Sequence, residues 1–357
     1  MLDANLNRCR EGLRVLEDVA RFLLNDGELS KRFKIMRHDL AQKTKPLGVV
    51  LLSRRDSEGD VGARFSASYS REARLAPRDA SDLVAANAKR VEESLRVIEE
   101  LARLPEISSM LNSTSFEQMR FTVYTLERDL ISRISRRDKT EKIVGLYVIL
   151  DRELLAGRDE LDIVAQIIDG GARIVQLRDK SRFYGEKERK LLPVAQKIRD
   201  LCHRAGALFI INDYFDLAVA VDADGLHVGQ QDLPLPIIRR ELPIDRIVGC
   251  SVRTVSQAKK AESEGADYVS VGSIFPTATK KEARVVGVNR IRELKASVSI
   301  PVVAIGGINR NNIAEVVSAG ADAVAVISAV LGEKDVKEAV GKLIEKMDLA
   351  KQQCRSL

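Results

Sequence analysis

Two acidic segments between residues 208 and 232 have residue types and spacing suited to chemistry. The apolar run Leu208–Ile211 is followed at once by an amide and Asp213, and the run Gly225–Val228 is followed closely by two amides and Asp232. Such short, β-branched runs are typical of buried strands, and consecutive parallel strands end at the same edge of a sheet. Carboxylates with amide neighbours suit Mg²⁺, which commonly shares its site with phosphate oxygens. The alternative is that both aspartates only form turns or cap helices.

Further apolar runs in the second half of the chain would form the strands that position these carboxylates. Helix-like polar stretches such as 187–206 and 255–265 separate most of the runs, and a glycine often precedes the next run. Eight strands alternating with helices over about 200 residues form the pattern of an α/β fold of the (β/α)₈ TIM-barrel type. The alternative is an open, doubly wound sheet. The expected strands are Gly145–Leu150, Ile174–Leu177, Leu208–Ile211, Leu226–Val228, Ile247–Val252, Tyr268–Ile274, Pro301–Ile305 and Ala323–Ile327.

In such a barrel, the residues that follow the strands share one rim, where the fold keeps its active site. Gln176, Arg178 and Lys180, at the end of the second strand, are therefore expected on the same rim as the aspartates. Gly306 and Gly307 end the seventh strand and would let backbone N–H groups approach a phosphate. Taken singly, the glycines could form only a tight turn and the lysine could be merely solvated. Together they predict a ligand site with two anion-binding ends.

The first 140 residues contain an internal repeat. Residues 4–21 read ANLNRCREGLRVLEDVAR and residues 86–103 read ANAKRVEESLRVIEELAR. Their apolar spacing predicts amphipathic helices. Each copy carries Arg and acidic residues three and four positions apart, a spacing that favours ion pairs along one helix face. These residues are Arg14, Asp18 and Arg21 in the first copy, and Arg96, Glu100 and Arg103 in the second. These charged residues either form a structural network of ion pairs or bind phosphates.

The repeat belongs to a mainly α-helical domain expected over residues 1–138. Further helices are expected at 29–45, 79–103 and 115–135. A charged run without apolar periodicity follows, so we expect a linker near 137–142 and a barrel domain over 143–350. The sequence has neither the P-loop nor the Rossmann glycine motif.

Composition excludes several classes of protein. The 357 residues include no Trp and only 4% aromatics, which argues against a stacking platform for single-stranded nucleic acid. The net charge of +6 is dispersed and suits phosphorylated small molecules better than DNA. No apolar run approaches the length of about 18 residues that a membrane helix needs. The four widely spaced cysteines indicate reduced thiols without structural zinc. We expect a cytoplasmic homo-oligomer with no nucleic-acid or membrane partner.

Residues 143–347 resemble the thiamine phosphate synthase family, also called thiamine-phosphate pyrophosphorylase. The resemblance rests on motifs that occur in order: LYVIL (146–150), QLRDK (176–180), IND (211–213), DGLHVGQQD (224–232), GCS (249–251), GSIFPTATK (272–280), AIGGI (304–308) and GADAVAVIS (320–328). It implies a transferase of thiamine biosynthesis that couples hydroxymethylpyrimidine diphosphate to hydroxyethylthiazole phosphate and releases pyrophosphate. A thiazole tautomerase-like relative is the alternative on this fold, but it would need no diphosphate site.

The resemblance also implies a role for each motif residue. Mg²⁺, one ion per barrel, would be held by Asp213 and Asp232. Catalytic cations would be Arg178, Lys180 and Lys280. The pyrimidine diphosphate would be bound by Gln176, Leu177, Arg178, Asp179, Lys180, Asn212, Ser251 and Lys280. The thiazole phosphate would be bound by Thr277, Ala278, Thr279, Gly307, Ile327 and Ser328. No side-chain nucleophile is needed, and His227 is interpreted as a core or supporting group rather than a base.

Residues 1–135 resemble a small helical domain of the hydroxymethylpyrimidine phosphate kinase type that is found fused to such synthases. The segment LDANLNRCREGLRVLEDVARF (2–22) carries the likeness. It implies a bifunctional enzyme that uses ATP to make the diphosphate for the barrel. The candidate residues of this unit are Asn5, Arg8, Glu11, Arg14, Arg90 and Glu93. The alternative is a non-catalytic dimerisation or regulatory module.

Overall fold

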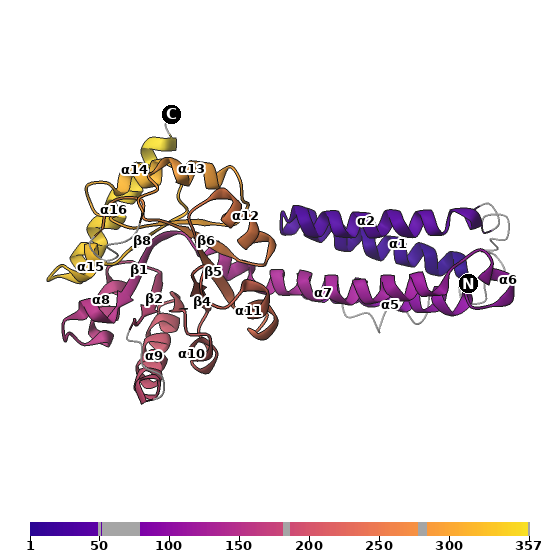
Figure 1. Cartoon of the computed structure of the whole chain (residues 1–357), viewed down its shortest axis with the longest axis horizontal. Coiled ribbons are helices and arrows are strands. Elements are labelled where there is room, and N and C mark those ends of the chain that lie inside the picture. Colours follow the sequence, from indigo (N-terminus) through magenta and orange to yellow (C-terminus); the bar gives the residue numbers. More distant parts are fainter. Residues whose placement is uncertain (49–50, 52–78, 181–185, 278–283, 356–357) are drawn as a thin grey trace. The chain divides into compact units, whose positions relative to one another are not determined.

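The computed structural model describes residues 1–48, 51, 79–180, 186–277 and 284–355. The chain divides into two compact units, Met1–Ser135 and Arg136–Leu357. The described part of the first unit is helical, and the second unit contains a closed barrel of parallel strands (Figure 1). Within the described ranges, no helix is both long enough and apolar enough to cross a bilayer.

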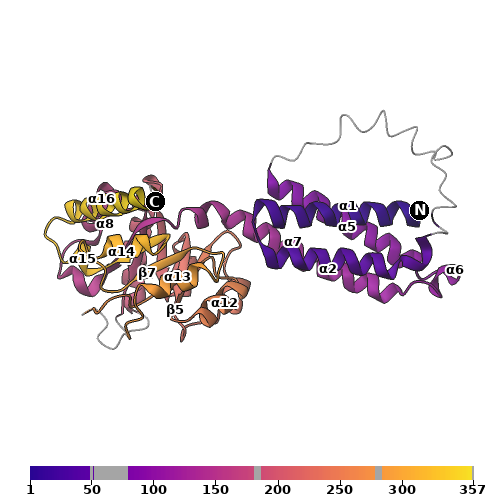
Figure 2. The same ribbon diagram turned by 90° about the horizontal axis from the view of Figure 1, so that it is seen from above.

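The first unit is built from long helices that lie side by side in both Figure 1 and Figure 2. Asp26 caps one of them by accepting hydrogen bonds from the backbone N–H groups of Glu28 and Leu29, at 3.1 and 2.9 Å. Apolar residues from these helices form one buried core. The described elements are α1 (Leu2–Asp18), the π-helical turn η1 (Val19–Leu23), α2 (Gly27–Lys43), the 3₁₀ turn η2 (Lys45–Leu47), α5 (Ala80–Leu101), α6 (Pro105–Ser108) and α7 (Ser113–Glu141).

The sequence repeat becomes a repeated pair of helices in the structure. The repeated segments form α1 and α5, which pack so closely that a Cβ atom on Gly12 would lie 2.6 Å from Val91 Cγ2. Each of these helices is also tied to the long helix that follows it by one ion pair. Glu17 on α1 pairs with Arg37 on α2 at 2.9 Å, and the buried Glu99 on α5 pairs with Arg120 on α7 at 3.2 Å. The unit is therefore an internally duplicated helical hairpin.

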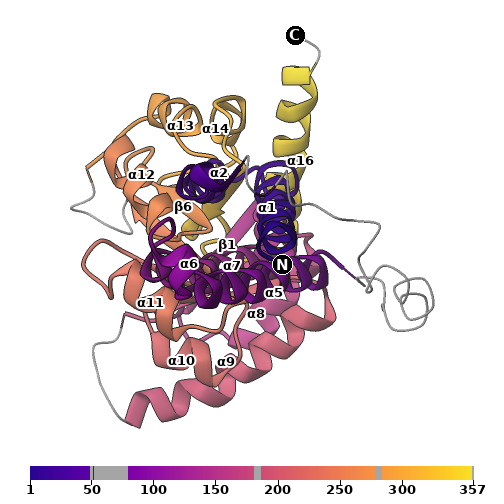
Figure 3. The ribbon, with the colours of Figure 1, turned by 90° about the vertical axis from the view of Figure 1, so that its right-hand side faces the viewer.

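The second unit is the predicted (β/α)₈ barrel, closed by pairing of β1 with β8. Helices surround the strands (Figures 1 and 3). The strands are β1 (Gly145–Asp151), β2 (Ile174–Arg178), β3 (Leu208–Asn212), β4 (Gly225–Val228), β5 (Ile247–Val252), β6 (Tyr268–Val271), β7 (Val302–Ile305) and β8 (Ala323–Val326). The helices are η3 (Arg152–Leu155), α8 (Glu160–Asp169), α9 (Glu186–Arg204), α10 (Phe215–Ala220), α11 (Leu235–Glu241), α12 (Val255–Ser263), α13 (Asn289–Lys295), α14 (Ile313–Ser318), α15 (Ser328–Leu331) and α16 (Val336–Arg355).

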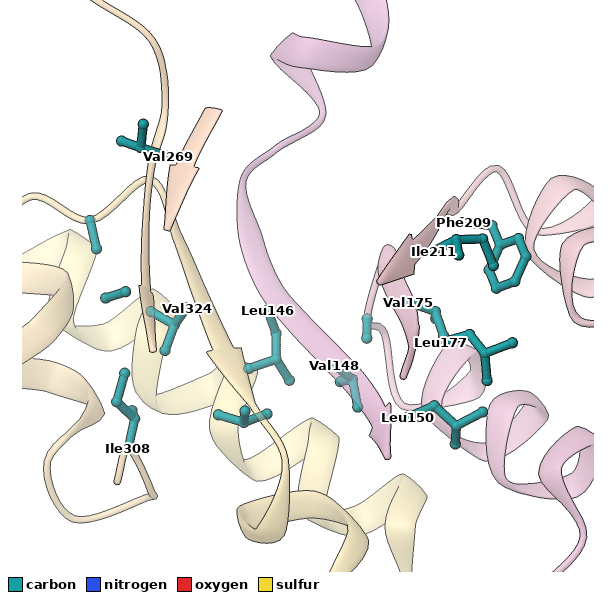
Figure 4. Packing of buried hydrophobic residues seen from close by; sticks show 14 of the residues in the cluster. Leu146, Val148, Leu150, Val175, Leu177, Phe209, Ile211, Val269, Ile308 and Val324 are labelled. Carbon is teal, nitrogen blue, oxygen red and sulfur yellow. The ribbon is translucent and has the colours of Figure 1, made fainter. Parts of the chain in front are cut away.

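The alternation of side chains along each strand separates two apolar cores. On β1, Leu146, Val148 and Leu150 join the core shared by the strands and the surrounding helices (Figure 4). The intervening Tyr147 and Ile149 join a smaller core inside the barrel. Side chains on the inner set of positions near the strand ends are therefore the ones that can reach the barrel mouth.

The linker expected near residues 137–142 is wrong, because α7 continues to Glu141. Two charged residues near this end of α7, Arg136 and Lys139, form ion pairs with the barrel, whereas Asp138 and Lys142 are exposed. Arg136 pairs with Asp267 at 2.8 Å, with both side chains 5% exposed, and Lys139 lies 3.4 Å from a carboxylate oxygen of Asp245. The absence of apolar periodicity in this run thus reflects polar packing against the end of the barrel.

The sixth strand is also shorter than expected, ending at Val271 instead of Ile274. Beyond Val271 the chain leaves the ladder but stays tied to the end of β7. The N–H of Ile274 donates to the carbonyl of Ile305 at 2.9 Å, and that of Phe275 donates to Gly306 at 2.9 Å. These bonds hold the segment beside the end of β7.

Candidate active site

A cavity of about 580 Å³ opens at the ends of the strands where the rim was predicted. It brings together residues from segments that are far apart in the chain. The predicted site residues that line it are Gln176, Arg178, Lys180, Asn212, Asp213, Asp232, Ser251, Thr277, Gly307, Ile327 and Ser328.

Asp213 and Asp232 form a pair of like charges in this cavity. The Asp213 backbone has φ of +64°, a left-handed conformation that aspartate tolerates, and its N–H donates to the carbonyl of His227 at 2.9 Å. Asp232 accepts a hydrogen bond from the N–H of Gly229 at 2.6 Å. Partial burial and the neighbouring Asp232 carboxylate raise the pKa of Asp213 to about 6. Two carboxylates in this state need a proton or a cation between them.

The donor set of this pair fits Mg²⁺. Both aspartates remain accessible from the cavity, so their oxygens can receive an ion. Within the described ranges, no three His, Cys, Asp or Glu side chains are grouped closely enough to hold a metal by themselves. A Mg²⁺ ion here would take its remaining ligands from water and from substrate phosphates, as this ion usually does.

Arg178 supplies a fixed positive charge beside the carboxylate pair. It ends β2 and forms an ion pair with Asp151, whose side chain is 2% exposed. Its charge favours the ionised form of Asp213 and so opposes the rise in that pKa. Lys180, two residues further on, also lines the cavity. This side of the cavity therefore suits a ligand with more negative charge than one phosphate.

The opposite lining of the cavity is made of close-packed backbone. Gly306 and Gly307 follow β7 with φ of +101° and +67°. A Cβ atom on Gly306 would lie 2.1 Å from the Ser273 hydroxyl oxygen, and one on Gly307 would lie 2.3 Å from the carbonyl of Pro276. Only glycine fits at these two positions. Ser328 begins α15 directly after β8 and lines the same cavity, which matches the usual phosphate site of such barrels.

A row of hydrogen bonds, most of them buried, crosses the barrel along the floor of the cavity. It connects Gln176, Tyr147, Tyr268, His227 and Ser251. Burial lowers the pKa of the His227 imidazole to about 4, which leaves it neutral at neutral pH and agrees with its interpretation as a supporting group. The two tyrosines were missed by the sequence analysis, although their inward positions on β1 and β6 follow from strand alternation.

Two predicted residues do not join the cavity, and three others lie outside the described residues. Leu177 is on the outward side of β2 and packs in the core between strands and helices. Asp179 is 9% exposed and pairs with Arg152 at 2.7 Å instead of lining the cavity. These two predictions treated QLRDK as a continuous binding loop, whereas alternation separates neighbouring side chains. Ala278, Thr279 and Lys280 fall outside the described residues.

The candidate residues of the helical unit lie mainly on its surface. Arg8, Glu11, Arg14, Arg90 and Glu93 are exposed. The predicted ion pairs are present between Arg14 and Asp18, at 3.2 Å, and between Arg96 and Glu100, at 2.6 Å. Asn5 is instead buried, and its side-chain amide donates to the Met1 carbonyl at 3.0 Å.

Known protein families match the helical unit and the barrel separately. The family described as thiamine monophosphate synthase matches residues 146–330, and the ThiD2 family matches residues 1–129. The thiamine-phosphate synthase of Nostoc punctiforme is 38% identical over 333 residues, covering 93% of this chain and 89% of its own. That of Synechocystis is 36% identical, covering 97% of this chain and 95% of its own. A solved thiamine phosphate pyrophosphorylase from Pyrococcus furiosus is 39% identical, covers 59% of this chain and 98% of its own, and superposes with a TM-score of 0.53.

Proposed function

Because this chain belongs to the thiamine-phosphate synthase family, we propose that its barrel cavity joins hydroxymethylpyrimidine diphosphate to hydroxyethylthiazole phosphate and releases pyrophosphate. One observation carries the assignment of the reaction to this cavity. A carboxylate pair beside Arg178 and the glycine-lined turn at Gly307 face the same space. The first suits a diphosphate accompanied by Mg²⁺ and the second suits a phosphate monoester.

The pyrimidine diphosphate occupies the side of the cavity that carries the charged residues. Gln176 and Ser251 contact the pyrimidine ring, while Arg178, Lys180 and Asn212 contact the diphosphate. Asp213 and Asp232 hold Mg²⁺, which when bound neutralises charge on the diphosphate. The family motif assigns Lys280 to the same ligand, but this residue lies outside the described residues.

The thiazole phosphate occupies the side lined by glycine. Backbone N–H groups at Gly307 and Ser328 approach its phosphate, and Thr277 and Ile327 line the space beside it. Ala278 and Thr279 belong to the same motif but lie outside the described residues. This placement lets the thiazole nitrogen face the pyrimidine methylene.

The coupling requires no nucleophilic side chain. The bond between the methylene carbon and the bridging oxygen breaks, and its electron pair leaves with the pyrophosphate. The aminopyrimidine stabilises the resulting cation, and the lone pair of the thiazole nitrogen forms the new carbon–nitrogen bond. Arg178 and Lys180 stabilise the charge that develops on the leaving group. No proton has to be transferred, which agrees with a neutral, buried His227.

We expect the stabilisation of the protein by Mg²⁺ and pyrophosphate to depend on pH. Burial and Asp232 raise the pKa of Asp213 to about 6 from 3.8, so the unliganded fold binds this proton more tightly than the unfolded chain. For this group alone, the unliganded fold therefore loses stability as pH rises between those values. Bound Mg²⁺ removes that penalty, so the rise in Tm on adding Mg²⁺ and pyrophosphate should be larger at about pH 7.5 than at about pH 5.

Thermal unfolding at both pH values, with and without the two ligands, measures this effect. Asp232→Asn should abolish most of the difference, because the repulsion and one metal ligand are lost together. An equal rise in Tm at both pH values in the unaltered protein would contradict the metal assignment.

The helical unit phosphorylates hydroxymethylpyrimidine phosphate with ATP, and so supplies the substrate of the barrel. Support comes from the match to the ThiD2 family over residues 1–129 and from the chemistry of the fusion. The barrel consumes a diphosphate that adding one phosphate to a monophosphate would provide. The exposed Arg8 and Arg90 occupy equivalent positions in the two repeats and suit phosphate contacts.

A coupled assay tests this step with the full chain. The protein receives hydroxymethylpyrimidine phosphate, ATP, Mg²⁺ and the thiazole phosphate, and thiamine phosphate is measured. We expect product, and we expect Arg8→Ala/Arg90→Ala to lose it from the monophosphate while keeping it from the diphosphate. Asp213→Asn is the matched control, because it should lose product from both. Product from the diphosphate but never from the monophosphate with ATP would favour the interaction-module alternative.

A further inference from the structure

The row of hydrogen bonds along the floor of the cavity links Gln176 to Ser251, which both line the cavity. Gln176 Nε2 donates to the Tyr147 hydroxyl at 2.8 Å, and the Tyr147 and Tyr268 hydroxyls are 3.1 Å apart. The Tyr268 hydroxyl lies 3.1 Å from His227 Nδ1, and His227 Nε2 lies 3.0 Å from Ser251 Oγ. The row therefore runs without a break from β2 through β1, β6 and β4 to β5.

The direction of these hydrogen bonds follows from the number of protons available. The Tyr147 hydroxyl accepts a hydrogen bond from Gln176, so it must donate its own hydrogen bond to Tyr268, the other group it contacts. Tyr268 in turn donates to Nδ1 of His227. A neutral imidazole has one donor and one acceptor nitrogen, so Nε2 donates to Ser251. Any reversal would leave a hydroxyl proton unpaired on Tyr147, whose side chain is buried.

This direction determines what the two end residues offer to the cavity. The amide of Gln176 uses one of its two N–H groups on Tyr147, and its Oε1 makes no hydrogen bond with the described residues, so the carbonyl oxygen is available as an acceptor. Ser251 already accepts from His227, so its hydroxyl proton is available as a donor. The Gln176 carbonyl as acceptor and the Ser251 hydroxyl as donor complement an aminopyrimidine, whose amino group donates and whose ring nitrogens accept.

The packing holds the row in place. Tyr268 is fully buried and stacks on His227 with ring centroids 5.6 Å apart. Gly249 makes room for the Tyr268 ring, since a Cβ atom there would lie 2.0 Å from its Cζ. The hydroxyl of Tyr268 consequently has little freedom to find other partners.

We propose that Tyr147, Tyr268 and His227 are positioning residues that make this site selective for an aminopyrimidine over a pyrimidine with the opposite hydrogen-bonding edge. The inference rests on the proposed coupling function and adds the residues that set ring specificity. All three border the cavity, but they set the selectivity through Gln176 and Ser251, which present the hydrogen-bonding groups to the ring.

The test compares two diphosphates in the coupling assay. One is hydroxymethylpyrimidine diphosphate, and the other is its oxo analogue, in which a carbonyl and a ring N–H replace the amino group and the adjacent ring nitrogen. The ratio of their kcat/KM values is measured for the unaltered chain and for Tyr268→Phe. Differences in intrinsic reactivity cancel when the two ratios are compared. We expect Tyr268→Phe to lower the preference for the amino substrate by about tenfold, the effect of about one hydrogen bond.

The reason is that the variant frees both ends of the row to reverse. Without the Tyr268 hydroxyl, His227 can carry its proton on Nδ1 and accept a hydrogen bond from Ser251 at Nε2. The Tyr147 hydroxyl can then donate to Gln176, whose amide rotates to turn its N–H groups toward the cavity. Tyr147→Phe breaks the row one bond away and should lower the preference in the same direction. Val269→Ala is the matched control, because Val269 adjoins Tyr268 on β6 but belongs to the outer core. It should lower stability without changing the preference.

Three outcomes would overturn the inference. If the unaltered chain makes no thiamine phosphate from the amino substrate, the proposed function fails and this inference fails with it. If it does make product but both tyrosine variants keep the full preference, only the positioning role is wrong. If Val269→Ala lowers the preference as much as they do, the effect belongs to stability and not to the hydrogen-bond row.

Discussion

Asp213→Asn and Asp232→Asn are each expected to lower kcat/KM for thiamine phosphate formation by roughly 10²–10³-fold, because each removes a charge that holds the metal–diphosphate complex. Either change also removes the repulsion between the two carboxylates, which adds to burial in raising the pKa of Asp213 in the unaltered chain. The folded state of the unliganded variants should therefore be at least as stable as that of the unaltered chain at neutral pH. Initial rates over a range of Mg²⁺ concentrations, together with thermal unfolding, measure both effects.

The matched control is Asp216→Asn. Asp216 lies three residues beyond Asp213, is exposed and does not line the cavity. Its replacement should leave the rate nearly unchanged. Full activity of both cavity variants at limiting Mg²⁺ would show that the two aspartates do not bind the ion.

Replacing Arg178 is expected to lower kcat by roughly 10²–10³-fold rather than to raise KM alone, because its charge stabilises the leaving diphosphate more than the bound substrate. Arg178→Ala would also leave the buried Asp151 without its ionic partner. The double variant Arg178→Ala/Asp151→Asn removes that second effect and should lose the same activity with a smaller loss of stability. Lys280 is expected to behave like Arg178.

Arg152→Ala is the control for charge removal near the site. Arg152 pairs with Asp179 and Glu160 and does not line the cavity. Steady-state kinetics with both substrates varied separates kcat from KM. A change confined to the KM of the pyrimidine diphosphate would mean that Arg178 only binds the ground state.

The barrel could be predicted from the sequence because each of its strands and helices is specified by a local pattern of residues. Each strand is a short apolar run and each helix has its own periodicity, so Ile174–Leu177 and Leu208–Ile211 were placed nearly as the structure has them. The linker was wrong because α7 continues through it, and charged residues near this end of α7 find partners far along the chain. Arg136 meets Asp267, and no local pattern announces such an ion pair.

In the candidate site, too, the sequence predicted the residues that follow a strand but not those that depend on contacts between distant strands. Residues that directly end a strand, such as Asp213 and Arg178, were placed on the rim by topology alone. Tyr147 and Tyr268 were missed because the contact between their hydroxyls exists only once the barrel has closed. The repeat was visible in sequence, but the equivalence of the ion pairs Glu17–Arg37 and Glu99–Arg120 required the packed helices.

The central claim, that one barrel cavity binds the metal–diphosphate and the thiazole phosphate at opposite ends, is tested most directly by a crystal structure with both products. Crystals grown with thiamine phosphate, pyrophosphate and Mn²⁺ in place of Mg²⁺ would show the ion by its anomalous scattering. The predicted result is an anomalous peak between the carboxylates of Asp213 and Asp232, with pyrophosphate beside Arg178 and the phosphate of thiamine phosphate against Gly307 and Ser328. Products bound in this cavity with the ion elsewhere, or products bound outside the cavity, would contradict it.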